Sequence, residues 1–593
     1  MCGIAGEFRF DGERPTLETL QSINDMQKCR GPDDEGIVND GEFAFAHTRL
    51  SIIDLSKRSS QPMTDSDNGL AITYNGEVYN YREVRKKLAK NGHTFKSDGD
   101  AEVVLKGYAQ WGPRVLSNLN GMFAFAIYDF RKKRLFMARD RLGIKPLYYH
   151  INGDRLRFAS TLPALLEYDD IKPEVNREAL NYYLTFHSVV PAPHTIIEGI
   201  RKLPNASHML VCKDGSHEVK RYWSLEYNRK KYEPSDVEAC KKALHKLLAK
   251  SVKRRMVSDV PVGVLLSGGL DSSLITGMLS KKGQKGLKTF SIGFEDVEGE
   301  KGNEFMYSDI IAEEFGTDHT KIQVKSDKAL SHMRPCVKAM SEPMVSHDVI
   351  GFYLLSEEVS KHVKVVQSGQ GADEIFAGYH WYPPLAETIN PVQDYGRLFF
   401  DRDFTEYKQT VDESMVEADY ATQFLESHFS KKGADRNIDK VFRLDTEVML
   451  VEDPVKRVDN MTMAWGLEAR VPFLDHEVVE FSARLPPQLK LMDGGKGILK
   501  ALARDVIPSE VIDRPKGYFP VPGLKYVRGE YLDYILEVLS DSNVRDRGIY
   551  QPAYLKNILK DPDKHITPLR GSKLWQMAVL ELWMQAHIDG LSK

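Results

Sequence analysis

The sequence predicts a layered α+β domain followed by an α/β domain that is built on a mostly parallel sheet. A chain of 593 residues exceeds what one hydrophobic core supports. Short strands separated by Gly, Asp and Asn dominate residues 1–170, whereas apolar strands alternate with helices from residue 234 onward. We therefore predict two domains, at residues 1–215 and 216–593.

The N-terminal domain combines short strands with two helices. Apolar runs bounded by turn residues predict strands at 41–47, 70–75 and 122–129. Helices are predicted at 16–28 and 81–90, and Asn91-Gly92 supplies a C-terminal stop for the second helix. Strands with interspersed helices are typical of a layered α+β domain.

A transition rich in turn signals covers residues 186–230 and includes a predicted hairpin around Lys213-Asp214-Gly215. The domain boundary is expected within this stretch or directly after it. A long amphipathic helix is predicted from Pro234 to Met256, with Ser235 as its N-cap and Glu238 as the capping-box partner.

The α/β domain begins with strands that run into polar loops. Strands are predicted at 260–266, 287–294 and 363–367, and a helix at 274–280 follows the first strand. This order predicts βαβ units, whose ligands bind beyond the carboxyl ends of the strands.

Composition excludes several classes of protein. A net charge of −4 argues against a nucleic-acid partner. Five scattered cysteines without C-x-x-C spacing argue against disulfides and zinc, and they fit a reducing compartment. No apolar run approaches the roughly 18 residues that span a bilayer, and no signal-peptide pattern opens the chain. We therefore expect a cytoplasmic protein with small-molecule substrates and no membrane partner.

Cys2 is a candidate nucleophile because it directly follows the initiator methionine. Removal of the methionine would give Cys2 a free α-amine beside its thiol. An α-amine titrates near ~8 and can take the thiol proton directly or through a water.

The run Ser267-Gly268-Gly269-Leu270-Asp271-Ser272-Ser273 predicts a phosphate-binding loop between a strand and a helix. The glycines let backbone N–H groups approach an anion, and the helix N-terminus and serine hydroxyls add donors. Asp271 fits beside phosphates if it binds Mg²⁺. Asp373, after another strand end, is a second candidate metal carboxylate.

The loop at 267–273 lacks the lysine of the P-loop. It resembles that of ATP pyrophosphatases, which cleave ATP between the α and β phosphates and adenylate their substrate.

The N-terminal part resembles the class II glutamine amidotransferase domain, an Ntn-hydrolase with a four-layer α+β sandwich. The runs that carry this resemblance are 2–4 (CGI), 30–33 (RGPD), 49–53 (RLSII), 75–80 (NGEVYN), 99–102 (GDAE) and 138–148 (ARDRLGIKPLY).

The remainder resembles the synthetase domain of asparagine synthetases, an α/β ATP-pyrophosphatase domain. The matching runs are the loop at 267–273 and residues 290–293 (FSIG), 368–374 (SGQGADE) and 467–475 (LEARVPFLD). Together the two resemblances cover essentially the whole chain. They imply an enzyme that hydrolyses glutamine, adenylates a carboxylate with ATP and Mg²⁺, and converts it to an amide; they also imply a homodimer.

The resemblance assigns the glutaminase residues. Cys2 would attack the glutamine side-chain amide, and the Asn75 side chain with the Gly76 N–H would form the oxyanion hole. The glutamine-binding residues would be Arg49 as carboxylate clamp, Glu77 and Asp100 for the ammonium group, and Leu50, Ile53, Asn75 and Gly76.

In the synthetase part, the resemblance places ATP contacts at Leu266, Ser267, Gly268, Gly269, Asp271, Ser272, Ile292, Ser368 and Gly369. Asp271 and Asp373 would hold the metal. Lys496, in the run 494–497 (GGKG), matches a catalytic lysine that supports adenylation and amide formation.

One position departs from the asparagine synthetase pattern, because Gln370 stands where those enzymes have glutamate in S-G-E-G. The stretches 157–166, 186–193 and 370–384 resemble a distinct branch, the N-acetylglutaminylglutamine amidotransferases, which make an osmoprotectant. An N-acetylated acceptor has no ammonium group, so a neutral amide at 370 is chemically reasonable there.

Three functional hypotheses remain open at this point. The acceptor is N-acetylglutaminylglutamine, or it is aspartate with Gln370 a tolerated substitution, or the chain is a non-catalytic nucleotide-binding relative. The presence of Cys2, Asp271 and Asp373 argues against the third hypothesis.

Overall fold

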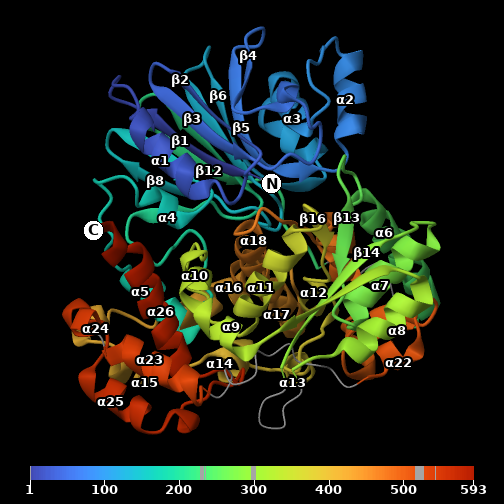
Figure 1. The fold of residues 1–593 in the computed structure, drawn as a ribbon, viewed down its shortest axis with the longest axis vertical. Helices are drawn as coiled ribbons and strands as arrows, with labels where there is room; N and C mark the ends of the chain where they lie inside the picture. The colour runs from blue at the N-terminus through green and yellow to red at the C-terminus, as the bar shows by residue number, and fades with distance from the viewer. Residues whose placement is uncertain are drawn as a thin grey trace.

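The computed structural model describes residues 2–227, 233, 235–295, 302–514, 527–540 and 542–592. Figure 1 shows the N-terminal part of the chain as one lobe that rests on a larger lobe formed by the rest. In the described part of the chain, no helix has the length and apolar character needed to cross a membrane.

Two antiparallel sheets of six strands form the N-terminal lobe. The first has the order β10-β8-β9-β1-β3-β2 and the second the order β12-β11-β7-β6-β5-β4. The strands of the first are β1 (Gly3–Arg9), β2 (Asp34–Asp40), β3 (Phe43–Arg49), β8 (Tyr148–Asn152), β9 (Arg155–Ala159) and β10 (Ile200–Lys202). Those of the second are β4 (Met63–Asp65), β5 (Leu70–Val78), β6 (Gly121–Asp129), β7 (Arg134–Arg139), β11 (Ser207–Cys212) and β12 (His217–Arg221).

An apolar core that includes Phe8, Phe45, Ala126 and Tyr128 fills the space between the two sheets. Helices α1 (Leu17–Gln27) and α4 (Leu162–Leu165) cover the first sheet, while α3 (Asp100–Trp111) lies on the second and α2 (Tyr81–Lys90) packs on α3. The predicted four-layer α+β sandwich is therefore confirmed.

The predicted hairpin near residue 214 is formed by β11 and β12, with Val211 paired to His217. Because β12 still belongs to the second sheet, the division predicted after residue 215 falls inside the hairpin turn. We propose to place the division after Arg221, where this sheet ends.

The second lobe is built on five parallel strands in the order β15-β14-β13-β16-β17. Their bounds are β13 (Val262–Leu265), β14 (Lys288–Phe294), β15 (Asp318–Val324), β16 (Val365–Gln367) and β17 (Glu468–Arg470). The chain leaves β13 toward β14 on one side and later returns to place β16 on the other. The carboxyl ends of β13 and β16 therefore meet at the switch point of the sheet, where such folds bind ligands.

Helices surround this sheet, as Figure 1 shows for α6, α7, α8 and α11. The helices used below are α6 (Val237–Arg254), α7 (Leu270–Lys281), α8 (Phe305–Phe315), α10 (Met333–Lys338), α11 (Asp348–Ser360), α12 (Ala372–Phe376), α18 (Lys456–Met463), α19 (His476–Arg484), α21 (Gly497–Ala503) and α26 (Lys573–His587).

Two local predictions about helix starts are wrong. Helix α6 begins at Val237, and neither Ser235 nor Asp236 caps it with a side chain. The Asp236 carboxylate instead accepts a hydrogen bond from the Glu233 N–H at 2.9 Å. The predicted capping-box partner Glu238 pairs with Lys241 at 3.0 Å. The helix predicted from residue 274 begins at Leu270, so Asp271, Ser272 and Ser273 lie in its first turn.

Candidate active sites

Cys2 lies just before β1, in the middle of the first sheet, and only 6% of its surface is exposed. Its N–H donates to Asn75 Oδ1 at 3.0 Å, and its carbonyl accepts from Arg30 Nε at 3.3 Å. Burial raises the pKa of the thiol, whereas the Leu50 backbone and the charge on Arg49 act in the opposite direction. Met1 lies outside the described residues.

Asn75 has an orientation that suits an oxyanion hole. Because its Oδ1 accepts from the Cys2 N–H, its Nδ2 must be the donor end, and Nδ2 has no hydrogen-bond partner among the described residues. Gly76 has no room for a side chain, since a Cβ there would lie 2.5 Å from the Met122 carbonyl on β6. The close approach of β5 to β6 therefore requires glycine beside Asn75.

Arg49, the last residue of β3, holds the loop that carries Leu50 and Ile53. Its guanidinium donates to the carbonyls of Asp54 at 2.5 Å, Ser56 at 3.1 Å and Ile53 at 3.5 Å. The predicted clamp is thus a buried cation close to Cys2 that also fixes its neighbouring loop. Its contact with a glutamine carboxylate stays a prediction.

The two predicted ammonium anchors have different surroundings. Asp100 accepts from the Tyr74 hydroxyl at 2.6 Å and from the Val78 N–H at 2.9 Å. Glu77 lies 3.4 Å from Arg470 of the second lobe. Burial and the neighbouring Glu468 raise the pKa of Glu77, and Arg470 opposes them. Glu77 therefore also pairs between the lobes, a role that the sequence did not predict.

A second set of buried charges joins the lobes next to Cys2. Arg30 lies 3.0 Å from Asp459 of α18, and Lys145 lies 2.9 Å from the other oxygen of the same carboxylate. All three side chains are at most 4% exposed. The two cations hold the pKa of Asp459 below its ordinary value despite burial. Asp459 was missed because nothing in its own segment indicates that its partners lie in the N-terminal domain.

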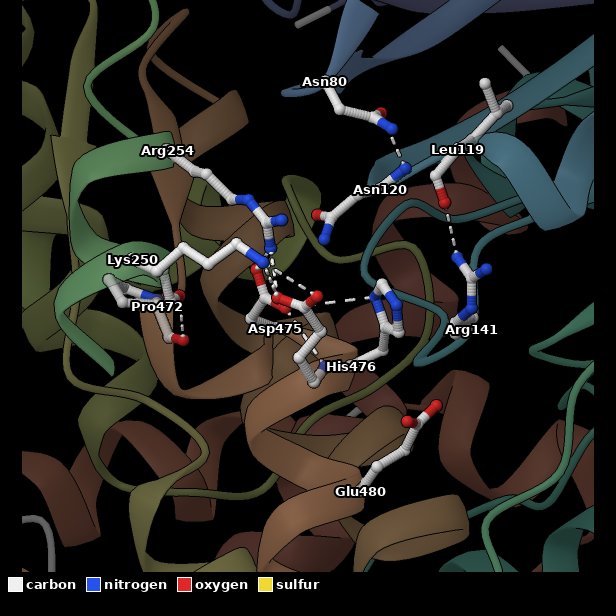
Figure 2. Close-up of polar contacts among 12 residues, drawn as sticks. Asn80, Leu119, Asn120, Arg141, Lys250, Arg254, Pro472, Asp475, His476 and Glu480 are labelled. Carbon is white, nitrogen blue, oxygen red and sulfur yellow. Dashed lines mark hydrogen bonds and ion pairs between the residues drawn. The ribbon is translucent and has the colours of Figure 1, made fainter. Parts of the chain in front are cut away.

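Figure 2 shows polar side chains at the start of α19 in the second lobe, beside Arg141 of the N-terminal lobe. Arg254 of α6 pairs with Asp475 at 3.3 Å, and His476 faces the segment of Arg141, whose guanidinium donates to the Leu119 carbonyl at 2.8 Å. Burial and then the charge on Arg141 lower the pKa of His476. The charge on Arg141 of the N-terminal lobe therefore acts on His476 of the second lobe.

The predicted phosphate loop joins β13 to α7 at the switch point. Gly268 adopts a φ of +68°, and a Cβ there would lie 2.6 Å from the Ser308 N of α8. The Ser267 N–H donates to Ser272 Oγ at 3.2 Å, which folds the loop over the start of the helix. Ser368 and Gly369 follow β16, and a Cβ on Gly369 would lie 2.9 Å from Asp271 Cβ. The two loops therefore touch.

Lys496 lies between the two predicted metal carboxylates. Its Nζ is 2.6 Å from Asp271 and 2.8 Å from Asp373. Burial acts to lower the pKa of Lys496, but the two carboxylates outweigh it and raise the pKa. The structure thus brings together three residues at the starts of three helices, α7, α12 and α21, which are far apart in the sequence. Two convergent carboxylates supply the hard oxygen ligands that Mg²⁺ prefers.

A cavity of about 180 Å³ opens at this point. Most of the predicted ATP-binding residues line it, together with Gln370 and Asp373; they are Leu266, Ser267, Gly269, Asp271, Ser272, Ile292, Ser368 and Gly369. Gly268 does not line it but packs on α8.

The sequence missed the wall that α11 gives to this cavity through Asp348, Phe352 and Leu355. It also missed Glu374, which is buried behind Asp373 and accepts from the Tyr379 hydroxyl at 2.7 Å. The apolar periodicity of α11 indicates burial only, so it carried no signal for a site.

Two family models match the chain. The model "Glutamine amidotransferase domain" covers residues 1–223, and the model "Asparagine synthase" covers residues 243–585. Asparagine synthetase [glutamine-hydrolyzing] 1 of Bacillus subtilis (strain 168) is 31% identical over 99% of this chain and 97% of its own length. Asparagine synthetase [glutamine-hydrolyzing] 3 of the same organism is 32% identical over 88% and 87%, and amidase chry2 of Gibberella zeae is 27% identical over 92% and 93%.

The fold and the family model define a glutamine amidotransferase domain joined to a second domain with a predicted phosphate-binding loop. Such enzymes are carbon–nitrogen ligases that draw nitrogen from glutamine, and this chain is an enzyme of that type. The chain belongs to the asparagine synthase family.

We expect Asn75→Ala to lower kcat for glutamate release from glutamine by about 10²–10³-fold, because one oxyanion donor is lost. Amide synthesis from added ammonium should stay within the range of wild type. The measurement is steady-state glutaminase kinetics, with exposed Asn91→Ala as the control. A loss confined to KM would contradict the assignment.

Glu374 should make stability depend on pH. Burial, followed by the charge on Asp373, raises its pKa from 4.5 to about 7. Because the folded state binds this proton more tightly than the unfolded chain, stability falls as the pH rises from about 4.5 to about 7. In Glu374→Gln, the free energy of unfolding should fall by roughly 3 kcal/mol less over this pH range than in wild type.

Thermal unfolding at pH 5 and pH 8 tests this expectation, with exposed Glu426→Gln as the control. If the unfolding midpoints of Glu374→Gln and wild type change in parallel with pH, the buried carboxyl does not have the raised pKa.

Proposed function

We propose that this enzyme hydrolyses glutamine at Cys2 and uses the ammonia, together with ATP, to amidate the carboxylate of N-acetylglutaminylglutamine. The observation that carries the choice of acceptor is Gln370, which lines the cavity beside Asp373 and the phosphate loop. Asparagine synthetases have a glutamate at the matching position.

In the first reaction the Cys2 thiolate attacks the side-chain amide carbon of glutamine. Asn75 Nδ2 and the Gly76 N–H would stabilise the oxyanion of the tetrahedral intermediate. The C–N bond breaks, ammonia leaves with the proton that the thiol gave up, and water then hydrolyses the thioester to glutamate. Burial of Cys2 keeps the thiol protonated until a base removes the proton, a role that suits the α-amine of a processed chain.

In the second reaction the acceptor carboxylate attacks the α-phosphorus of ATP, and pyrophosphate leaves. Ammonia attacks the acyl carbon of the resulting acyl-adenylate, the C–O bond to AMP breaks, and a proton is lost to give the amide. The N–H groups of the loop at 267–269 and the start of α7 would hold the pyrophosphate. Lys496 would donate to the charged oxygens.

Asp271 and Asp373 would hold Mg²⁺ together with the phosphates. When bound there, Mg²⁺ would neutralise charge on the leaving pyrophosphate. In the described residues no group of three or more His, Cys, Asp or Glu side chains could by itself hold a metal ion. Two carboxylates plus phosphate oxygens are the usual arrangement for Mg²⁺.

The absence of a charge on the side chain of residue 370 supports an N-acetylated acceptor. A free amino acid such as aspartate carries an ammonium group, which a carboxylate at this position would stabilise. Gln370 offers only a neutral amide, and an acetylated peptide has no ammonium group to pair. Relatives over nearly the whole chain include both asparagine synthetases and a protein named amidase chry2, so the relatives do not all carry the same name.

Aspartate is the second candidate acceptor, because the asparagine synthetases of Bacillus subtilis match this chain over most of its length. A non-catalytic nucleotide-binding relative is a weaker candidate, since the chain keeps Cys2 beside Asn75 and Lys496 beside Asp271. The cytoplasmic location and the homodimer stay predictions.

Cys2→Ala should abolish amide formation from glutamine but keep amide formation from added ammonium, because the second site does not use the thiol. Asp271→Asn should abolish both, since it removes a carboxylate from the nucleotide site. Amide product is measured with each nitrogen source. Loss of both activities in Cys2→Ala would contradict the two-site assignment.

Exchange of ³²P between pyrophosphate and ATP identifies the acceptor, because it requires adenylation but not ammonia. We expect exchange with N-acetylglutaminylglutamine and little with aspartate. Gln370→Glu should weaken exchange with the acetylated dipeptide, whereas Gln370→Asn should keep most of it. Exchange driven by aspartate alone would show that N-acetylglutaminylglutamine is not the acceptor. The proposed adenylation and amide formation would remain valid.

A further inference from the structure

One carboxylate in the wall of the nucleotide cavity has no part in the reaction described above. It belongs to Asp348, the first residue of α11, which lines the cavity together with Gln370 and Asp373. Of its side chain 26% is exposed, so Asp348 can meet a ligand in its present rotamer.

The Asp348 carboxylate has room for further hydrogen bonds. Its Oδ1 accepts from Ser346 Oγ at 3.4 Å, the one hydrogen bond that this side chain makes within the described residues. Its Oδ2 lies 3.6 Å from Arg457 Nη2, beyond hydrogen-bond distance, and is not a covered atom. A carboxylate accepts about four hydrogen bonds, so a ligand with donors finds free acceptor sites here.

Arg457 supplies a positive charge beside this carboxylate. It also lies 3.3 Å from Asp453, so the two acids share one guanidinium. Burial raises the pKa of Asp348, and the charge on Arg457 acts in the opposite direction. Because a cation already lies beside Asp348, a ligand does not have to bring one, and a neutral N–H donor suffices.

Helix α11 separates Asp348 from the apolar wall of the cavity. Asp348, Phe352 and Leu355 share one face of the helix, and the seven residues from the first to the last span about 10 Å. The apolar end suits the flat base of a nucleotide, and it is lined by Leu265, Leu266, Phe290, Ile292, Phe352 and Leu355.

Asp348 belongs to the opposite end, near the loop that carries Gln370 and Asp373. Burial acts to lower the pKa of Arg457, but nearby acidic groups raise it, and these include both Asp348 and Glu374. Glu374 is buried behind Asp373. Asp348 and Gln370 are therefore at the same end of the cavity, where the acceptor is proposed to bind.

The two side chains complement a peptide group. Gln370 makes no side-chain hydrogen bond within the described residues, so its amide can donate to a carbonyl oxygen. Asp348 as a carboxylate can only accept, which matches an N–H group. An amide group offers both partners, whereas the amino end of a free amino acid offers an ammonium group and no carbonyl.

We propose that Asp348 is a specificity-determining residue for the acceptor, whose carboxylate accepts a hydrogen bond from an amide N–H of an N-acylated peptide. The inference rests on the proposed function, because it takes the acceptor to be such a peptide.

Isothermal titration calorimetry on the full-length protein tests this role. The protein is saturated with Mg²⁺ and α,β-methylene-ATP, which cannot release pyrophosphate, and is titrated with N-acetylglutaminylglutamine or aspartate. Asp348→Leu removes both oxygens at similar size, and Asp348→Asn keeps one carbonyl oxygen without the charge. Asp318→Leu is the matched control, because Asp318 is an exposed aspartate of the same lobe outside the cavity.

We expect Asp348→Leu to raise the Kd of the acetylated dipeptide roughly 10- to 100-fold, the loss that follows from one hydrogen bond to a charged group. Asp348→Asn should raise it less, because a neutral oxygen still accepts. The Kd of α,β-methylene-ATP, measured without the dipeptide, should stay as in wild type, and Asp318→Leu should change neither value.

An unchanged dipeptide Kd in Asp348→Leu, or a rise confined to the nucleotide, would overturn this inference and leave the proposed function standing. A larger loss for aspartate than for the dipeptide would also overturn it, because Asp348 would then pair with an ammonium group.

If Asp348→Leu loses the nucleotide as well, Asp348→Asn decides. Weaker dipeptide binding with normal nucleotide binding supports the inference, and any other result in that variant overturns it. Binding of aspartate but not of the dipeptide by the wild-type protein would refute the proposed acceptor itself, and this inference with it.

Discussion

The buried charges between the lobes are the interaction on which the arrangement of the two sites depends. Arg30 and Lys145 meet on Asp459, and Glu77 meets Arg470. Charges removed from water are tolerated only when their partners stay in place, and loss of one partner typically costs about 3–5 kcal/mol. The lobes therefore cannot slide past each other without exposing an unpaired charge.

The same contacts lead directly into both sites. Arg30 bonds the carbonyl of Cys2, and Glu77 lies two residues after Asn75 on β5. On the other side, Arg470 belongs to β17, where it pairs in register with Gln367 at the end of β16. The loop of Ser368 and Gln370 follows at once. A short path of bonded neighbours thus connects the glutaminase nucleophile to the cavity where the acceptor is proposed to bind.

Local motifs in the sequence predicted the parts of the structure that depend on local geometry. The phosphate loop could be predicted because a strand, a glycine turn and a helix start are contiguous. The pairing of Arg30 with Asp459 joins positions 429 residues apart, and no local rule contains it. Even a local rule failed at Ser235, because Asp236 accepts from the Glu233 N–H and Glu238 pairs with Lys241, which also lies 3.2 Å from Asp505 of a distant segment.

The ammonium of Lys496 between Asp271 and Asp373 explains how one site can take a highly charged nucleotide. Two carboxylates and one ammonium leave a net charge of one negative at the place where the pyrophosphate is proposed to bind. A polyphosphate alone would be repelled by this charge, whereas a phosphate that arrives with Mg²⁺ brings the compensating cation. With Mg²⁺ bound, the carboxylates would have the metal as partner, and Lys496 would pair with phosphate oxygens. If ATP binds here as proposed, the charge of these three residues would favour the magnesium complex of ATP over free ATP.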